Sequence, residues 1–367
     1  MKVLQIYKTY TPDTFGGVEQ VIKNIVTETQ ALGSQHSLLT VSKQPRQDQI
    51  DDLPVIRCKE NFTLASCPFS LDFLKQFKKI ARQFDILHFH YPWPFGDLSY
   101  LLRHIDQPSV VTYHADALKH AILKKIYAPI QHRFLDKVDC IVSTSKNLTR
   151  SSPILQKYQS KVESIPIGIN PADYPYPTPA LQQKWADQLG SDFALFVGVL
   201  RHYKGLLTLL EAAKKTALPI VIAGGGPLQD QLEALIVQHQ LWHVHVLGRV
   251  SEADKIALLS LCNMVILPSE NRAEAFGVSL LEGMIFRKPL ISTELGTGTS
   301  FVNVHGVTGF VIPPHQAEPL AEKINFLHEH SHEAREMGEA AYTRFINEFQ
   351  SATMGARYFK LYADLLR

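Results

Sequence analysis

Short apolar runs recur along the chain, and each ends in a glycine-rich or polar loop that leads into an amphipathic stretch. The first run, Val3–Tyr7, is followed by Gly16 and Gly17 and then by helical periodicity from about Val18 to Leu32. Parallel strands connected by helices produce this alternation, because both faces of such a sheet are buried. Further strands are predicted at Ser37–Val41, Ile86–His90, Val110–Tyr113 and Cys140–Thr144. The pattern predicts an α/β fold with a doubly wound parallel sheet in the first half of the chain.

A proline-rich segment interrupts this alternation. Residues 170–179 read Asn-Pro-Ala-Asp-Tyr-Pro-Tyr-Pro-Thr-Pro, which indicates a stiff linker or a loop that crosses a cleft. The alternation then restarts at Phe193–Gly198, with strands predicted at Ile220–Ala223, Val244–Leu247, Met264–Leu267, Pro289–Ser292 and Phe310–Ile312 and helices at Leu206–Lys215 and Pro227–Gln238. A chain of 367 residues suits two domains. We therefore expect two doubly wound Rossmann-like domains, 1–173 and 174–351, that face each other across a cleft.

Composition places the chain among ordinary globular proteins. Hydrophobic residues make up 45% and charged residues 20%, which supplies enough apolar material for a full core. The start of the chain turns polar too soon for a signal peptide, and no apolar stretch reaches the length of a membrane-spanning helix. The cysteines are far apart and fit neither a metal site nor a disulfide framework; they are Cys58, Cys67, Cys140 and Cys262. A reducing, cytoplasmic location is the simplest interpretation.

The net charge of +2 conceals an asymmetry between the two halves. Residues 1–173 hold 21 Lys and Arg against 16 Asp and Glu, a net +5, whereas residues 174–367 hold 16 against 19, a net −3. The excess of positive charge lies in Lys75–Lys79 and in Lys119–Lys137. These residues either form solvated helix faces or attract an anionic membrane surface or an anionic lipid-linked substrate. Clustered DNA-binding signals are missing, which argues against nucleic acid as a partner.

The segment Glu274-Ala-Phe-Gly-Val-Ser-Leu-Leu-Glu282 carries the most chemical information. If a helix begins at Val278, the amides around Phe276, Gly277 and Val278 are the unpaired donors of its N-terminus, which attract phosphate. Glu274 then lies beside this anion site, and Glu282 lies about one helical turn further on. Carboxylates accept hydrogen bonds from sugar hydroxyls. A phosphate site beside two carboxylates is therefore typical of a site for a nucleotide-sugar.

Other candidate residues follow predicted strands, where open α/β sheets bind their ligands. After the first strand, Gly16 and Gly17 let a ligand approach the backbone, although a plain tight turn explains them as well. His114 follows the strand Val110–Tyr113 and is either a cleft residue or a hydrogen-bonded structural histidine. His88 and His90 suggest a metal site, but no carboxylate or cysteine spacing supports one.

The second half supplies the cations that a leaving diphosphate requires. Arg201 and Lys204 follow the strand Phe193–Gly198 and precede a helix; an arginine grips a phosphate with two donors, and a lysine adds a point charge. Gly224-Gly225-Gly226-Pro227 predicts a turn into a helix with proline in its first position, and a nucleotide could approach Gly225 closely. The loop around Val250 could bond a base, and Ser251 is a predicted N-cap.

Taken in order, these motifs resemble the family 4 glycosyltransferases, a retaining family with the GT-B fold. The resemblance covers nearly the whole chain and is carried by the ordered set Gly16–Glu19, His114, Gly198–Gly205, Gly224–Pro227, Pro268-Ser269, Glu274–Glu282 and Gly306–Gly309. Any one of these motifs is weak evidence. Their order and spacing together are specific.

The resemblance implies a role for each matching residue. Arg201 and Lys204 would hold the donor diphosphate, Glu282 the ribose hydroxyls, and Glu274 with the 276–278 backbone the transferred sugar and its nearer phosphate. Gly17 would approach the donor phosphate, and His114 would face the donor sugar and the acceptor. The implied catalytic residues are His114, Arg201, Lys204 and Glu274, and the implied donor-binding residues are Gly16, Gly17, Arg201, Lys204, Gly225, Val250, Glu274, Phe276, Gly277, Val278 and Glu282. A C-terminal helix at about 352–367 would pack back on the first domain.

The implied reaction uses neither a metal nor a cofactor besides its nucleotide-sugar donor. No convincing Asp-x-Asp metal motif is present, so the two cations and the helix dipoles would stabilise the leaving diphosphate. Many family members have Gly-Gly-Glu where this chain reads Gly296-Thr-Gly-Thr-Ser300, and residues 291–303 look more like bacterial polysaccharide transferases that use GDP-mannose or a related GDP-sugar. The acceptor would be lipid-linked or an oligosaccharide, at the inner face of the cytoplasmic membrane, as in O-antigen synthesis.

Several alternatives share the fold. The chain could be a UDP-sugar-dependent transferase, a nucleotide-sugar epimerase, or a nucleotide-sugar-binding protein without transfer activity. The last would be favoured by loss of Glu274, Glu282, Arg201 or Lys204, and all four are present. A phosphorylase would require a pyridoxal-binding lysine context, which the sequence lacks. An NAD-dependent oxidoreductase is disfavoured because the first strand is not followed by G-x-G-x-x-G.

Overall fold

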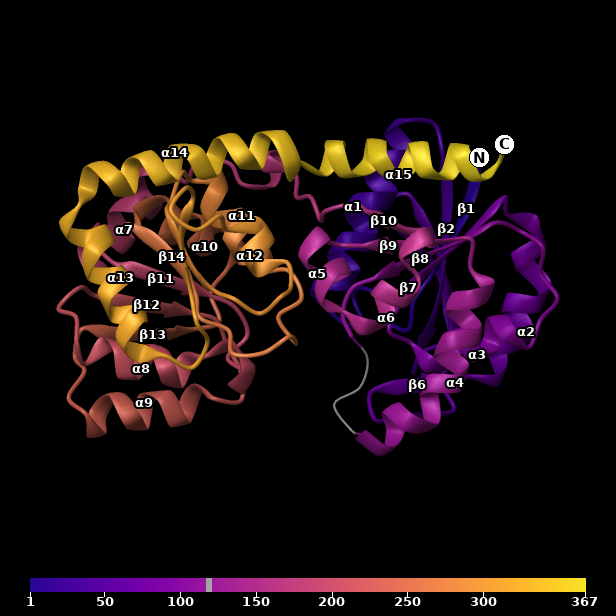
Figure 1. The fold of residues 1–367 in the computed structure, drawn as a ribbon, viewed down its shortest axis with the longest axis horizontal. Helices are drawn as coiled ribbons and strands as arrows, with labels where there is room; N and C mark the ends of the chain where they lie inside the picture. Colours follow the sequence, from indigo (N-terminus) through magenta and orange to yellow (C-terminus); the bar gives the residue numbers. More distant parts are fainter. Residues whose placement is uncertain (117–120) are drawn as a thin grey trace. The chain divides into compact units, whose positions relative to one another are not determined.

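The computed structural model describes residues 1–116 and 121–367 (Figure 1). The chain forms two compact units, one made of residues 1–168 and 351–367 and the other of residues 169–350. It passes from the first unit to the second between Gly168 and Ile169 and returns between Gln350 and Ser351. The sequence-based boundary at 173 and 174 lies further along, at the end of a short 3-10 helix (Pro171–Asp173) that belongs to the second unit.

The first unit is built on an eight-stranded sheet in which the strand order is β10-β9-β8-β7-β1-β2-β4-β3. All neighbours are parallel except β3 and β4. The strands are β1 (Lys2–Ile6), β2 (Gln35–Ser42), β3 (Arg46–Ile50), β4 (Leu53–Lys59), β7 (Ile86–Tyr91), β8 (Ser109–Tyr113), β9 (Cys140–Ser143) and β10 (Val162–Ser164). The sequence did not predict the β3–β4 extension.

Helices cover both faces of this sheet. In Figure 1, α1 (Gly17–Ala31) and α15 (Ser351–Leu365) lie on one side of the sheet, and α2, α3 and α4 lie on the other. The remaining elements are α2 (Leu71–Ile80), α3 (Pro94–Leu101), α4 (Ala121–Lys137), α5 (Lys146–Ser151), α6 (Pro153–Lys157) and the hairpin β5 (Phe62–Leu64) and β6 (Cys67–Phe69). Helix α15 packs on α1, where the hydroxyl of Ser351 donates to the carboxylate of Glu28. The C-terminal helix is therefore an integral part of the first unit.

The second unit contains six parallel strands in the order β13-β12-β11-β14-β15-β16. These strands are β11 (Ala194–Val197), β12 (Ile220–Ala223), β13 (Val244–Gly248), β14 (Met264–Leu267), β15 (Leu290–Thr293) and β16 (Gly309–Ile312). Its helices are α7 (Pro179–Leu189), α8 (Leu206–Ala213), α9 (Gln229–Gln238), α10 (Glu252–Leu261), α11 (Val278–Ile285), α12 (Thr299–Val302), α13 (Ala317–Glu329) and α14 (Ser331–Glu348). The mixed α/β fold with two Rossmann-like halves confirms the predicted fold class.

One local prediction in the second unit was wrong, and another was confirmed only in part. Helix α9 begins at Gln229 rather than at Pro227, because residues 227 and 228 still form the turn that follows the glycines. The proline-rich segment is only partly a linker: Thr178 caps α7, and Pro179 is the first residue of that helix. Proline suits this position, because its fixed φ is helical and the first turn does not need its missing N–H.

The core matches the apolar runs of the sequence. Strands β7, β8, β12 and β14 are buried along their whole length, as expected for parallel strands with helices on both faces. All four cysteines are buried and carry free thiols. Within the described ranges, no helix combines the length and the hydropathy that a bilayer-spanning segment requires.

Candidate functional site

In the second unit, the predicted residues gather at the carboxyl ends of three adjacent strands. Strand β11 lies between β12 and β14, so the loops that follow these strands are neighbours. The β11 loop carries Arg201 and Lys204, the β12 loop carries Gly225, and the β14 loop carries Glu274. The parallel arrangement therefore places distant parts of the sequence at one edge of the sheet.

A close backbone contact fixes the β11 loop against the β14 loop. Gly205 has a left-handed conformation (φ 72°), and a Cβ atom at this position would lie 1.9 Å from the carbonyl oxygen of Pro268. Only glycine permits this approach. The amide of Glu270 also donates to the carbonyl of Tyr203 at 2.7 Å, and the hydroxyl of Thr208 donates to the Glu270 carboxylate at 2.7 Å. These contacts bring Lys204 next to Glu274.

Lys204 and Glu274 form an ion pair, with 2.5 Å between Nζ and Oε2. The two side chains are only 12% and 10% exposed, so water screens their charges incompletely. Ser269 donates to the same carboxylate oxygen at 3.0 Å, and the hydroxyl of Thr297 donates to the Glu274 carbonyl at 2.7 Å. An ammonium group has three donors, and Glu274 accepts from one of them. The pair can therefore donate to an anion and accept from a hydroxyl at the same point.

The predicted helix start beside this pair is present. Helix α11 begins at Val278, and its N-cap Gly277 has a φ of 89°, which turns the chain sharply into the helix. Phe276 is buried before this turn, and the amide of Gly298 donates to the Ala275 carbonyl at 2.8 Å. The first amides of α11 have no partner earlier in the helix, as at any helix N-terminus. Val278 is half-buried at this end.

Glu282 lies one turn into α11 in a different set of contacts. Its Oε1 accepts from the hydroxyl of Tyr174 at 2.9 Å and from Nζ of Lys255 at 2.8 Å. Burial lowers the pKa of Lys255, but Glu282 and Glu252 more than offset this, so that the net shift is upward. Burial and the Glu282 charge raise the pKa of Tyr174. The two carboxylates predicted to share one site thus form two separate pairs, and one oxygen of Glu282 is already engaged.

Tyr174 and Lys255 are partners that the sequence did not reveal. Tyr174 lies among the prolines of residues 170–179, and Lys255 is one of many helical lysines. Neither is near Glu282 in the sequence, since 108 and 27 positions separate them from it. No local pattern marks them, because only the packing of α10 and the segment before α7 against α11 brings them to the carboxylate.

The other predicted donor-site residues of this unit have simpler surroundings. Arg201 is exposed, and no ion pair to it is found among the residues that the structure describes. The carbonyl of Gly225 accepts from the amide of Leu200 at 3.1 Å, which ties the β12 loop to the β11 loop. Val250 is half-buried before Ser251. Ser251 is the N-cap of α10 and accepts from the amide of Asp254 at 3.1 Å, which confirms that prediction.

In the first unit, Gly16 and Gly17 lie at the start of α1. Gly16 is the N-cap, and Gly17 is the first helical residue. The carboxylate of Glu19, two residues on, is buried and accepts from the hydroxyls of Thr9 at 2.9 Å and Thr14 at 2.6 Å. A carboxylate in the first turn offsets the attraction of a helix N-terminus for anions. A Cβ atom at Gly16 would lie 2.7 Å from Oε2 of Glu19, whereas one at Gly17 would meet nothing within 4 Å, so the room for a ligand near the backbone is at Gly17.

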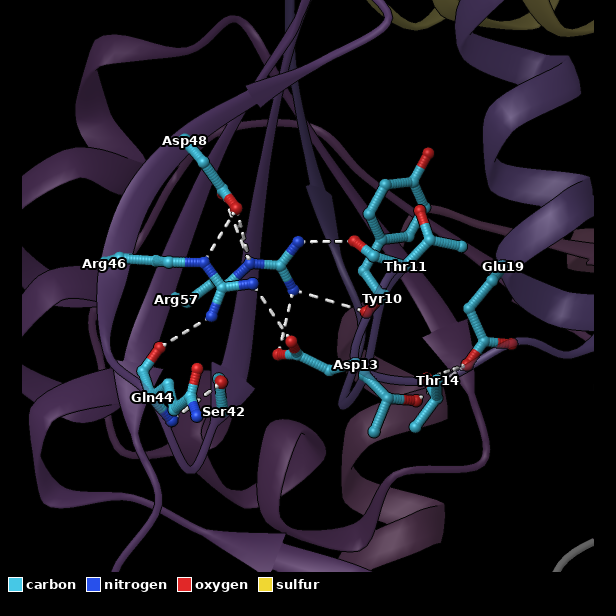
Figure 2. A network of polar contacts seen from close by, with 11 residues as sticks. Tyr10, Thr11, Asp13, Thr14, Glu19, Ser42, Gln44, Arg46, Asp48 and Arg57 are labelled. Carbon is cyan, nitrogen blue, oxygen red and sulfur yellow. Dashed lines mark hydrogen bonds and ion pairs between the residues drawn. The ribbon is translucent and has the colours of Figure 1, made fainter.

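A buried arginine holds the loop that leads to these glycines. Figure 2 shows the guanidinium of Arg57, on β4, in contact with Asp48 and Asp13 and with the backbone of Tyr10 and Thr11. The side chain of Arg57 is completely buried, whereas both carboxylates are about one quarter exposed. Arg46, on β3, pairs with the same two carboxylates from the solvent side. The β3–β4 pair thus anchors the 8–16 loop.

His114 follows β8 and is buried. Its Nε2 lies 3.1 Å from Nδ1 of His90, and burial lowers its pKa to about 3, so the ring is neutral at physiological pH. Both ring nitrogens of His88 are engaged, with the hydroxyls of Tyr362 and Thr112 at 2.7 Å each. His90 uses its other nitrogen on Gln5 at 2.8 Å. His88 and His90 are therefore members of a hydrogen-bond network rather than metal ligands.

Two Rossmann-like units with glycine-rich and charged loops at the ends of their strands define the GT-B class of α/β proteins. Residues 15–173 match the family described as Glycosyltransferase Family 4, and residues 178–344 match Glycosyl transferases group 1. The chain belongs to the family 4 glycosyltransferases and is a glycosyltransferase, as its sequence predicted.

Two relatives and one solved structure illustrate this membership. D-rhamnosyltransferase WbpZ of Pseudomonas aeruginosa is 44% identical over 94% of this chain and 91% of its own length. O-antigen chain mannosyltransferase C of Escherichia coli is 43% identical over 100% of this chain and 99% of its own. The crystal structure of Anabaena Alr3699/HepE in complex with UDP-glucose covers 99% of this chain and 100% of its own, with a TM-score of 0.78 at 18% identity. This last likeness concerns the fold.

We predict that Arg57→Met lowers the free energy of unfolding by about 3 kcal/mol, because it removes buried charge-assisted hydrogen bonds to two carbonyls and one of the two arginines that pair with Asp13 and Asp48. Arg46→Met is the matched control: it removes the other arginine from the same two carboxylates, but at a solvated position. Its effect should lie within the error of a urea denaturation curve. Equal losses in the two variants would contradict the assignment of Arg57 as the anchor.

Proposed function

We propose that this glycosyltransferase is a retaining, metal-independent hexosyltransferase of bacterial O-antigen synthesis. It transfers mannose or a related hexose from a GDP-sugar to a lipid-linked or oligosaccharide acceptor. The observation that carries the proposal is the preformed pair of Lys204 and Glu274 beside the N-terminus of α11. This arrangement offers donors to a diphosphate and an acceptor to a sugar hydroxyl within one small volume.

The reaction breaks one bond and forms one. The bond between the anomeric carbon of the hexose and the diphosphate oxygen breaks, and the acceptor hydroxyl oxygen bonds to the same face of that carbon. The hydroxyl proton passes to the leaving phosphate. Negative charge grows on the diphosphate as the bond breaks, and Lys204, Arg201 and the α11 amides stabilise it. These groups would take the place of a divalent metal. Glu274 would orient the sugar through its hydroxyls.

The choice of donor is supported by the relatives. One is named a mannosyltransferase and the other a D-rhamnosyltransferase, and each covers more than nine tenths of this chain. Their names favour mannose or a closely related hexose, and the first names the O-antigen chain. A UDP-sugar remains the alternative, because a structure with the same fold was solved with UDP-glucose. Epimerisation of the donor or binding without transfer are the further alternatives.

We also propose that the first unit rests on an anionic membrane, where a lipid-linked acceptor would be found. Phe62 and Leu64 on β5 and Leu71 at the start of α2 are 57%, 58% and 64% exposed. They belong to adjoining segments, since the amide of Leu71 donates to the side chain of Asn61 at 2.8 Å. Helix α2 also exposes Lys75, Lys78 and Lys79 while it buries Phe73, Phe77 and Ile80. Apolar side chains beside lysines suit the interface of an anionic bilayer.

The second basic segment contributes less to this surface. Lys124, Lys125 and Ile126 are exposed on α4. Lys137 donates to the carbonyls of Tyr100 and Arg103 at 3.3 Å and 2.9 Å and is thus engaged at the end of α3. Lys119 lies outside the described residues. The proposed membrane surface is therefore defined as Phe62, Leu64, Leu71, Lys75, Lys78 and Lys79.

The donor is tested by thermal shift with GDP-, UDP- and ADP-sugars in a buffer that contains EDTA, followed by assays of transfer, hydrolysis and epimerisation. We expect a GDP-sugar alone to raise the melting temperature by several degrees, because a ligand stabilises the fold that binds it. Transfer should proceed in EDTA. A shift with UDP-sugars only would show that the donor is a UDP-sugar and not a GDP-sugar. Formation of an epimerised product in place of a transferred sugar would show that the enzyme is an epimerase. Activity that is restored only by added Mg²⁺ or Mn²⁺ would refute metal independence.

We predict that Lys204→Ala abolishes transfer, with a fall in kcat of at least about a hundredfold, because a cation that stabilises the leaving diphosphate is lost. The variant should remain folded by circular dichroism. Lys214→Ala is the matched control, since Lys214 pairs with Glu211 at 2.8 Å on the surface of the second unit. Near-normal turnover of the Lys204 variant would show that the diphosphate is bound elsewhere.

For the membrane surface, we predict that the protein co-sediments with vesicles that contain phosphatidylglycerol and not with pure phosphatidylcholine vesicles, and that salt weakens the binding. The triple change Phe62→Ser, Leu64→Ser and Leu71→Ser should abolish co-sedimentation. The control changes Val237→Ser and Trp242→Ser remove similarly exposed apolar side chains from the second unit and should have no effect. Equal losses in both variants would contradict a dedicated surface.

A further inference from the structure

A row of buried polar side chains crosses one face of the sheet in the first unit. In strand order the row runs through His36 on β2, Gln5 on β1, His90 on β7 and His114 after β8. All four are at least nine-tenths buried. The registers Val3↔His36, Gln5↔His88 and His90↔Thr112 show that each step moves about two residues toward the carboxyl ends of the strands. The row therefore climbs diagonally from the interior to the strand ends, where His114 lies.

The direction of the hydrogen bonds in this row is set at its inner end. The hydroxyl of Thr29, on α1, donates to the carbonyl of Ile25 at 2.6 Å. A carbonyl can only accept, so the single hydroxyl proton of Thr29 is used on Ile25, and the Thr29 oxygen accepts from Nε2 of His36 at 2.8 Å. The hydroxyl of Ser34 lies 2.7 Å from the same nitrogen and accepts from it as well. Burial lowers the pKa of His36 to about 3. The neutral ring then carries its proton on Nε2 and leaves a lone pair on Nδ1.

The side-chain amide of Gln5 links His36 to His90 and keeps the same direction of hydrogen bonding. Nδ1 of His36 lies 3.2 Å from the Gln5 amide and can only accept, so the NH₂ group of Gln5 must face it. The same NH₂ group lies 3.5 Å from the hydroxyl of Tyr362 on α15. The opposite orientation of the amide would place an oxygen against the lone pair of His36. The Gln5 oxygen therefore faces Nε2 of His90 at 2.8 Å and must accept its proton.

The last step fixes His114. His90 is buried, which holds its pKa well below the ordinary value, so the neutral ring has a proton on Nε2 and a lone pair on Nδ1. That lone pair lies 3.1 Å from Nε2 of His114, which must then be the donor. The neutral ring of His114 is left with its lone pair on Nδ1. In the part of the chain that the structure describes, no group donates to this nitrogen.

We propose that Gln5 and His90 are positioning residues that hold His114 in its Nε2-protonated form, with Nδ1 presented as a hydrogen-bond acceptor. The identity of its partner rests on the proposed function: the group that donates to Nδ1 of His114 is a hydroxyl of the hexose or of the acceptor sugar. His114 in this form donates no proton to the substrate, since its only N–H is given to His90. It orients a hydroxyl instead of acting as a general acid.

The protonation state is tested without any substrate. The full chain is labelled with ¹⁵N-histidine, and two-bond ¹⁵N–¹H correlations identify which ring nitrogen carries the proton; His114→Gln assigns the signal. We expect Nε2–H at His36, His90 and His114, with no titration between about pH 6 and 8. A proton on Nδ1 of His114, or titration of His114 in that range, would overturn the proposal. This result does not depend on the identity of the donor.

The positioning role is tested with two variants of His90. In His90→Gln the amide can donate to Gln5 and accept from His114, which preserves the direction of the row, whereas His90→Leu can do neither. We expect His90→Leu to lower kcat about ten- to a hundredfold, the loss seen when groups that orient metal-ligating histidines are removed, and to change the His114 signal. His90→Gln should restore most of both. Equal loss in the two variants would overturn the proposal.

The controls separate this proposal from the proposed function. Tyr358→Phe removes a buried hydroxyl that bonds Thr112 at 2.8 Å, beside the row but outside it, and should change neither kcat nor the His114 signal. If the wild-type protein transfers no hexose from any nucleotide-sugar, the proposed function fails, and the ¹⁵N spectra still decide whether His114 is held as an acceptor. If transfer is normal and the spectra show Nδ1–H, only the positioning proposal fails.

Discussion

The contact between the β11 loop and the β14 loop is the constraint on which the candidate donor site depends. Gly205 lets the backbone of one loop touch Pro268 of the other, and this brings Lys204 within ion-pair distance of Glu274. The pair is mostly shielded from water, so each charge is stabilised chiefly by its partner and by nearby hydroxyl groups. An incoming diphosphate and sugar would find a cation and a carboxylate already ordered. Such preorganisation lowers the entropy lost on binding.

The first unit buries a charged arginine at one edge of its sheet and neutral histidines in the interior of the same sheet. At the β3–β4 edge, Arg57 is buried with its full charge, because two carboxylates and two carbonyls surround it. In the interior of the sheet, the histidines are buried without such partners, and they are neutral for that reason. Neutral rings have one donor and one acceptor each, so a row of them has a direction. In the proposed row, the contacts of His36 with Thr29 and Ser34 and the orientation of the Gln5 amide set the hydrogen-bonding character of His114.

Sequence patterns predicted the elements that are buried along their whole length, since continuous apolar runs such as β12 and β14 leave few other interpretations. Helix α11 and the Ser251 cap were also predictable, because their signals lie within four residues. The edge strands β3 and β4 were missed: β3 (Arg-Gln-Asp-Gln-Ile) is polar and reads as a loop. The hydrogen bonds of Glu282 with Tyr174 and Lys255 could not be predicted from the sequence, because they join three segments that meet only after the helices pack.

By itself, the sequence determined the family, the two α/β halves and most of the residues at the strand ends, because hydrophobic periodicity and short motifs are local properties. Tertiary structure alone decided how those residues are used. It paired Lys204 with Glu274 and engaged one oxygen of Glu282. It also gave His88 hydroxyl partners and placed His90 in the row of buried polar side chains. Each outcome depends on which side chains lie within about 3 Å of one another, and that is set by the packing of segments distant in the chain.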